Sequence, residues 1–236
     1  MKILSLECSA IPCSVAVIED GKILANAFSN VRLTHSQTLM PMVESVLNSA
    51  RLAVSDIDAF AVAQGPGSFT GVRIGISAVK GLAQPEEKPC VGVSALHSMA
   101  VNYSDSDCFV CAVMDARCNQ VYNALFENNC GSITRLCEDR ALSISDLSAQ
   151  ISTMSQNGKR IYIVGDGAEL FYSSVKTEDN VILADEHRRY QNAVGVGVLA
   201  EKLLAEGKFA SPSKLEPLYL RLPQAERELK RKEEKL

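Results

Sequence analysis

The stretch that most constrains the fold is residues 59–83, AFAVAQGPGSFTGVRIGISAVKGLA. Residues 59–63 are small, apolar and compatible with a strand that is buried on both faces. The Gly65-Pro66-Gly67 sequence that follows cannot continue a strand or a helix, so the chain must turn there. Ser68 is placed to cap a helix through its hydroxyl, and no proline interrupts residues 69–83. The stretch therefore predicts a buried strand, a tight turn and a helix.

The predicted helix over residues 69–83 carries two apolar stripes at the helical period. The first consists of small residues and a leucine, Gly71, Gly75, Ala78 and Leu82. The second consists mainly of β-branched residues, Val72, Ile76, Val79 and Ala83. Glycine inside a helix costs about 1 kcal/mol relative to alanine, so a close contact must offset it. We predict a tight helix-to-helix seam, within the chain or between chains; the alternative is an ordinary intramolecular helix that tolerates small residues.

A second amphipathic helix is predicted over residues 35–50. Its apolar face is broad, with Leu39, Val43, Val46 and Ala50 in one line, flanked by Met40, Met42 and Leu47. Such a face can cover a sheet and still offer apolar surface to another helix. We therefore expect the two helices to form half of a four-helix bundle, completed by an equivalent pair from another subunit or from a second copy of the chain.

Composition indicates an ordinary globular protein. The chain has 236 residues, of which 47% are hydrophobic and 22% charged, and no run approaches the length of a membrane span. Because the N-terminal segment is a poor signal peptide, we expect a cytoplasmic protein with no membrane partner, whose eight cysteines are reduced and mostly buried. A net charge of -4 disfavours a protein that grips nucleic acid by itself.

The chain also contains a repeated pattern. Residues 3–18 read as a strand ending in an acid, Glu7, followed by a turn and a returning strand, and residues 108–129 repeat this order around Asp115. The pattern suggests an ancient duplication, although two hairpins can resemble each other by chance. We expect an N-terminal lobe over 1–104 that carries the two helices, a smaller lobe over 105–222 whose last helix could pack back on the first lobe, and a charged tail over 223–236.

Few residues suggest chemistry directly. Gly65, Gly67 and Gly71 are one position off the dinucleotide fingerprint, and Pro66 lacks the backbone donor that a phosphate would use there. Residues 165–168, Gly-Asp-Gly-Ala, follow an apolar strand and could let the backbone approach a flat ligand, although Asp-Gly is also a common turn pair. The three histidines show no metal-ligand spacing, so we expect no metal site.

With these segments in view, the chain resembles the TsaB (YeaZ) family, accessory subunits of the bacterial machinery that makes threonylcarbamoyladenosine in tRNA. The resemblance covers nearly the whole chain. It is carried by ILSLECSAIPCSVAVIEDG, THSQTLMPMVESVL, AVAQGPGSFTGVRIGISAVKGLA, PCVGVSALHSMA, Asp115-Ala116-Arg117 with Val121-Tyr122, GDGA, and Pro217-Leu218-Tyr219-Leu220-Arg221. The resemblance implies an α/β, actin-like and sugar-kinase-like ATPase (ASKHA) fold of two related lobes.

The resemblance also implies that the chain is not the transferase. In the catalytic relative, TsaD, two histidines spaced H-x-x-x-H hold a metal, whereas the comparable positions here are Ala95 and Met99, with His97 out of register. We therefore expect a non-catalytic activating scaffold that binds a TsaD-type threonylcarbamoyltransferase. It would support formation of threonylcarbamoyladenosine next to the anticodon. The alternatives are a stand-alone ASKHA-fold ATPase or small-molecule kinase, and a peptidase.

The partners implied are a TsaD-type catalytic subunit, a TsaE-type ATPase, tRNA only through the complex, and a second copy of the chain when the partner is absent. No intrinsic cofactor is expected; ATP or ADP and metal belong to partner subunits or to the shared interface. The predicted interface residues are His35, Leu39, Met42, Val43, Val46, Gly71, Val72, Gly75, Ile76, Ala78 and Val79. The residues matching a vestigial nucleotide site are Glu7, Cys8, Ser9, Gly165, Asp166 and Gly167.

Overall fold

The first sheet is built from the N-terminal part of the chain. The computed structural model describes residues 1–175 and 178–221, and the predicted tail over 223–236 lies outside them. Five strands pair in the order β3-β2-β1-β4-β5. Their bounds are β1 (Lys2–Glu7), β2 (Cys13–Glu19), β3 (Lys22–Ser29), β4 (Ala59–Gly65) and β5 (Cys90–Ser94). The three predicted opening strands are antiparallel, whereas β4 is parallel to β1 and β5 to β4.

The second sheet follows the same plan. Its strands are β6 (Asp107–Asp115), β7 (Gln120–Asn129), β8 (Ser132–Arg135), β9 (Arg140–Ser143), β10 (Ile161–Val164) and β11 (Val181–Leu183). Their order is β11-β10-β6-β7-β8, with β9 also pairing with β7. In both sheets the first strand has an antiparallel hairpin partner on one side and two parallel strands on the other. The predicted actin-like, two-lobed α/β fold is confirmed.

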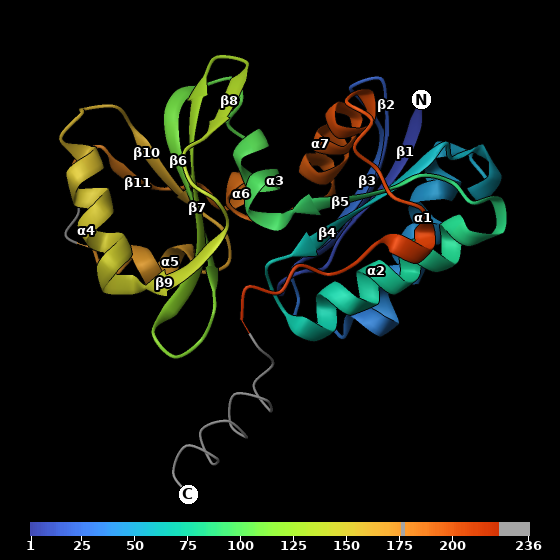
Figure 1. Cartoon of the computed structure of the whole chain (residues 1–236), viewed down its shortest axis with the longest axis horizontal. Coiled ribbons are helices and arrows are strands. Elements are labelled where there is room, and N and C mark those ends of the chain that lie inside the picture. The colour runs from blue at the N-terminus through green and yellow to red at the C-terminus, as the bar shows by residue number, and fades with distance from the viewer. Residues whose placement is uncertain (176–177, 222–236) are drawn as a thin grey trace, which may run out of the picture.

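Helices cover both faces of each sheet (Figure 1). Their bounds are α1 (His35–Ala50), α2 (Phe69–Ala83), α3 (Ala95–Val101), α4 (Ile144–Ser155), α5 (Ala168–Tyr172), α6 (Glu186–Arg189) and α7 (Ala193–Ala205). α1 and α2 pack on the outer face of the first sheet, and α4 and α5 on the outer face of the second. α3 and α7 lie between the two sheets. The result is five alternating layers of helix and sheet.

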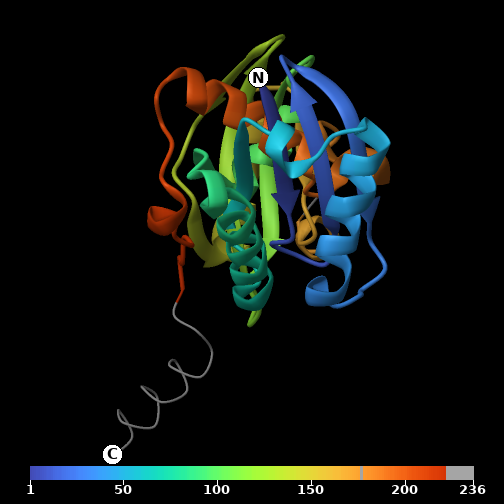
Figure 2. The same ribbon diagram turned by 90° about the vertical axis from the view of Figure 1, so that its right-hand side faces the viewer.

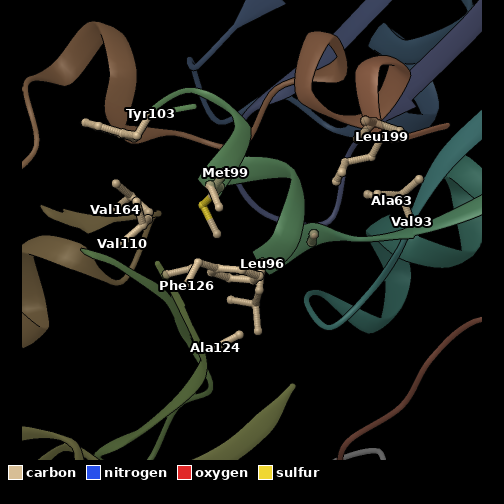
Figure 3. Packing of buried hydrophobic residues seen from close by; sticks show 14 of the residues in the cluster. Ala63, Val93, Leu96, Met99, Tyr103, Val110, Ala124, Phe126, Val164 and Leu199 are labelled. Carbon is tan, nitrogen blue, oxygen red and sulfur yellow. The ribbon is translucent and has the colours of Figure 1, made fainter. Parts of the chain in front are cut away.

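The middle layer joins the two lobes into one core. In the close view, Leu96 and Met99 of α3 pack with Phe126 of β7, while Leu199 of α7 lies toward the first sheet (Figure 3). α7 packs back on the first sheet, where the Ser5 hydroxyl donates to the carbonyl of Ala193 at 2.7 Å. The lobes are therefore joined by a continuous apolar layer rather than by a bare linker, while the predicted boundaries themselves stay a prediction.

The helix predicted from residues 69–83 forms as expected. Ser68 is its N-cap, and its hydroxyl accepts a hydrogen bond from the backbone of Gly71 at 3.3 Å. The predicted close contact at the small stripe also exists, but a turn makes most of it rather than a second helix. A Cβ added at Gly71 would lie 2.1 Å from the carbonyl oxygen of Cys8, and one at Gly75 would lie 2.7 Å from its sulfur. Gly71 also approaches the His35 ring of α1. The glycines therefore seat α2 against the turn after β1.

Candidate docking groove and inter-lobe cleft

α1 and α2 lie side by side on the outer surface of the first sheet (Figure 2). Between them is a hollow of about 610 Å³, here called the α1/α2 groove. It is lined by His35, Ser36, Leu39, Met40, Phe69, Thr70, Arg73, Ile74, Ser77 and Ala78. Met40 is 45% exposed, and Ile74 and Ala78 are half-buried. Apolar side chains held open to solvent between two helices are typical of a surface that binds another protein.

The periodicity of the two helices explains why this groove is open. On α1, Leu39, Val43 and Val46 point into the core, which leaves Met40 and Ser36 on the outer surface. On α2 the side chains of Val72, Ile76 and Val79 are buried in the same core. The residues that directly follow the first two of these, Arg73 and Ser77, therefore face outward. The groove is thus made from side chains that flank the two core stripes.

The predicted interface residues divide accordingly. His35, Leu39 and Ala78 line the groove. Met42 is half-buried against the core of the first lobe. The remaining seven are buried inside the chain, namely Val43, Val46, Gly71, Val72, Gly75, Ile76 and Val79. The prediction placed Val72, Ile76 and Val79 of α2 on the partner side. In the structure these side chains pack against apolar residues of β1 and β4, because burial removes both sets from water.

A second hollow, here called the inter-lobe cleft, lies where the two lobes meet. Its volume is about 770 Å³. Its walls come from the turns after β1, β4 and β6 and from the C-terminal segment. Among the lining residues are Ser9, Arg32, Ser68, Asp115, Arg117, Asp166 and Arg221. His35, Phe69 and Thr70 line both hollows, so the α1/α2 groove and the inter-lobe cleft share a rim.

The C-terminal segment forms one wall of the inter-lobe cleft. Residues 215–221, here called the C-terminal strap, run beside α2 on the side away from α1 (Figure 2). Leu215 is buried in the core of the first lobe, and the backbone of Leu218 donates to the carbonyl of Gln64 at 2.8 Å. The guanidinium of Arg221 then donates to the carbonyl of Ala116 in the second lobe. The strap therefore ties the end of β4 to the turn after β6.

Asp166 lines the inter-lobe cleft, and a second carboxyl group, that of Glu7, is buried close enough to feel its charge. Glu7 ends β1 with no exposed surface; its Oε1 accepts a hydrogen bond from the backbone of Ser9 at 2.7 Å, and its Oε2 is buried with no hydrogen-bond partner in the described structure. Burial raises the pKa of Glu7 to about 7, and the nearby charge of Asp166 adds to this. Burial likewise raises the pKa of Asp166 to about 6, although Gln191 donates to it at 2.7 Å.

The residues predicted as a vestigial nucleotide site lie in different environments. Ser9 and Asp166 line the inter-lobe cleft. The thiol of Cys8 instead donates to the carbonyl of Gly71, and Glu7 is wholly buried. Gly165 and Gly167 serve packing, since a Cβ at either would meet the backbone at the end of β6, 2.0 Å from the carbonyl oxygen of Val113 and 2.8 Å from the amide of Asp115. Of this set only Ser9 and Asp166 line the inter-lobe cleft, and nucleotide binding there stays a prediction.

The segment compared with the metal ligands of TsaD forms part of the core. Ala95 and Met99 are buried on α3, and Met99 packs between the lobes (Figure 3). His97 stacks on Phe126 with ring centroids 5.0 Å apart, and burial lowers its pKa to about 4. Within residues 1–175 and 178–221, no group of three or more His, Cys, Asp or Glu side chains could hold a metal ion.

Comparison with known proteins places this geometry in a family. The family model described as TsaD, tRNA N6-adenosine threonylcarbamoyltransferase, matches residues 22–229. The tRNA threonylcarbamoyladenosine biosynthesis protein TsaB of Escherichia coli (strain K12) is 33% identical over 223 residues, which cover 94% of this chain and 95% of that protein. The chain belongs to the TsaB family. The TsaB protein of Bacillus subtilis (strain 168) is 28% identical, with 96% of each chain covered.

Solved structures agree with TsaB membership. YeaZ from Pseudomonas aeruginosa superposes with a TM-score of 0.74 at 27% identity, covering 93% of this chain and 99% of that one. A second structure, an uncharacterized protein with similarity to peptidase YEAZ from the same organism, gives a TM-score of 0.76 over the same shares. In the part of this TsaB-family chain that the structure describes, no helix is long and apolar enough to cross a membrane.

Proposed function

We propose that this TsaB-family chain is a non-catalytic activating subunit that binds a TsaD-type threonylcarbamoyltransferase through the α1/α2 groove. In that complex it supports formation of threonylcarbamoyladenosine in tRNA. The observation that carries the proposal is the groove itself, an apolar hollow between two helices that are anchored from below by a complete core. Because the core stripes of α1 and α2 are already buried, the groove can take up partner side chains without rearrangement of the first lobe.

The relatives support the choice of partner and process. The Escherichia coli and Bacillus subtilis relatives are named as tRNA threonylcarbamoyladenosine biosynthesis proteins, and the matching family model carries the name of the transferase. A chain with the transferase's fold can pair with it as one half of a pseudo-symmetric dimer, because related folds present related helix pairs. The same reasoning gives a homodimer through the α1/α2 groove when the transferase is absent, and a TsaE-type ATPase joining the complex with its own nucleotide.

Binding of the purified chain to its cognate TsaD-type transferase tests this proposal. Met40→Asp puts a charge into the α1/α2 groove, and Leu170→Asp is a matched control because Leu170 is 44% exposed on α5 of the other lobe. Isothermal titration calorimetry should show binding of the wild type and of Leu170→Asp, with Met40→Asp weakened by about tenfold or more. Equal affinity of all three proteins would overturn the use of this groove.

The inter-lobe cleft supports a second candidate function, that of a stand-alone ATPase or small-molecule kinase of the same fold. It is large enough for a small molecule and has polar and charged groups along its walls. Turnover of ATP by the purified chain alone, abolished by Asp166→Asn, would favour that function. Absence of turnover together with stimulation of the transferase would favour the activating subunit.

A further inference from the structure

At the rim shared by the α1/α2 groove and the inter-lobe cleft, one arginine is held in place by aromatic rings. The guanidinium carbon of Arg73 lies 3.7 Å from the centroid of the Phe69 ring and 5.7 Å from that of Tyr219. The two rings stack with centroids 4.9 Å apart and an angle of 27° between their planes. Nε of Arg73 donates to the hydroxyl of Tyr219 at 2.6 Å. Stacking and this hydrogen bond fix the orientation of a side chain that otherwise has many rotamers.

In the part of the chain that the structure describes, this arrangement leaves the two terminal nitrogens of the Arg73 guanidinium without a hydrogen-bond partner. The hydrogen bond to Tyr219 uses only Nε, and no carboxylate in residues 1–175 or 178–221 forms an ion pair with Arg73. The two terminal nitrogens present parallel donors, the geometry that matches the two oxygens of a carboxylate. A fixed and exposed guanidinium beside an apolar hollow is suited to bind an anionic group.

The charges around the groove favour an acidic partner. Its lining contains Arg73 and His35 but no aspartate or glutamate, although the chain as a whole carries a net charge of -4. The groove lining of a second copy would present Arg73 and no carboxylate, so this lining favours a different polypeptide over self-pairing. On the groove side Arg73 borders apolar side chains such as Met40 and Ile74, which suits a protein carboxylate better than an RNA phosphate; the arginines of the neighbouring hollow line the inter-lobe cleft instead.

We propose that Arg73, positioned by Phe69 and Tyr219, binds an aspartate or glutamate side chain of the protein that docks in the α1/α2 groove. This proposal rests on the proposed function, since it names the chemistry by which the transferase would be recognised. It gives the C-terminal strap a role in assembly, because Tyr219, which contacts Arg73, directly follows Leu218, whose backbone is bonded to the end of β4. An arginine that is already oriented loses little freedom on binding and therefore contributes more to affinity.

Calorimetry with the cognate transferase separates this inference from the proposed function. Arg73→Ala should weaken binding by about tenfold or more, and Arg73→Lys by nearly as much because lysine keeps the charge but not the paired donors. Tyr219→Phe, which removes only the hydroxyl that orients Nε, should weaken binding severalfold. Arg160→Ala, an exposed arginine at the start of β10, is the matched control and should leave affinity unchanged. If Met40→Asp abolishes binding while both Arg73 variants bind like Arg160→Ala, the proposed function stands and this inference fails.

Chemical cross-linking identifies the anion. A carbodiimide joins an amine to a carboxylate in direct contact, so the complex containing Arg73→Lys should yield a cross-linked peptide that pairs position 73 with an aspartate or glutamate of the transferase. Mass spectrometry of the digested complex reads the site. A complex that forms without any cross-link from position 73 would overturn the inference, as would an Arg73→Ala defect seen only when tRNA is present, because the anion would then be a phosphate.

Discussion

Glu7 makes the stability of this chain depend on pH in a direction opposite to that of most carboxylates. Burial raises its pKa from 4.5 to about 7, so the folded chain holds a proton that the unfolded chain releases between these values. The folded state therefore has its full stability from this group below about pH 4.5, and it loses that stability as the pH rises to about 7. Each pKa unit is worth about 1.4 kcal/mol, so the loss amounts to about 3 kcal/mol.

Glu7→Gln removes the titration while keeping the shape of the side chain and the acceptor for the Ser9 amide. Its cost is an amide group placed where Oε2 has no partner, and this cost is the same at every pH. The free energy of unfolding of the variant relative to the wild type should therefore rise by about 3 kcal/mol between pH 4.5 and pH 8. Asp166→Asn, which removes the neighbouring charge, should shift the wild-type transition to lower pH.

Urea unfolding followed by circular dichroism at half-unit pH steps measures both effects. Subtracting the wild-type curve from the variant curve cancels the other titrating groups, since they are present in both proteins. A constant difference between the two proteins over pH 4.5 to 8 would show that Glu7 has an ordinary pKa. Burial of the Glu7 carboxyl with only one of its oxygens hydrogen-bonded would then not hold in solution.

Three further variants test the packing and the groove. Gly75→Leu should lower the melting temperature by several degrees, because its Cβ meets the Cys8 sulfur and Val62; an unchanged melting temperature would contradict the packing at α2. Ser68→Ala should reduce the free energy of unfolding in urea by about 1 kcal/mol through loss of the N-cap; a loss near zero would mean that the cap is not formed in solution. Met40→Asp should leave thermal unfolding unchanged while weakening transferase binding; a matching loss of stability would show that Met40 belongs to the core.

The sequence predicted the elements better than their surroundings. The glycine turn, the Ser68 cap and the two acids that end β1 and β6 could be read locally, because caps, turns and hairpins depend on neighbouring residues. Which apolar stripe of α2 faces a partner could not be predicted in this way. Two apolar stripes on α2 are equally visible in the sequence, and only the position of the turn after β1 shows that Gly71 and Gly75 of the small stripe pack within the chain.

Phe69, Arg73 and Tyr219 were missed as site residues for the same reason. Tyr219 reaches Phe69 and Arg73 from the other end of the chain, and no local signal gives that approach. Met40, which is exposed, and Ile74, which is half-buried, lie beside predicted positions, so examining the residues next to each core stripe could have found them. Substitutions at Val72 or Gly75 would not test assembly cleanly, because both positions are buried and a larger or charged side chain there would disturb the fold.

Reconstituted tRNA modification measures the central claim most directly, because it asks whether the α1/α2 groove is needed for the chain to act. The transferase, the remaining complex components and unmodified tRNA would be combined with wild type, Met40→Asp or Leu170→Asp, and threonylcarbamoyladenosine would be quantified by mass spectrometry. The account predicts modification with the wild type and Leu170→Asp, and little with Met40→Asp or with no added chain. Full modification without the chain, or with Met40→Asp, would contradict it.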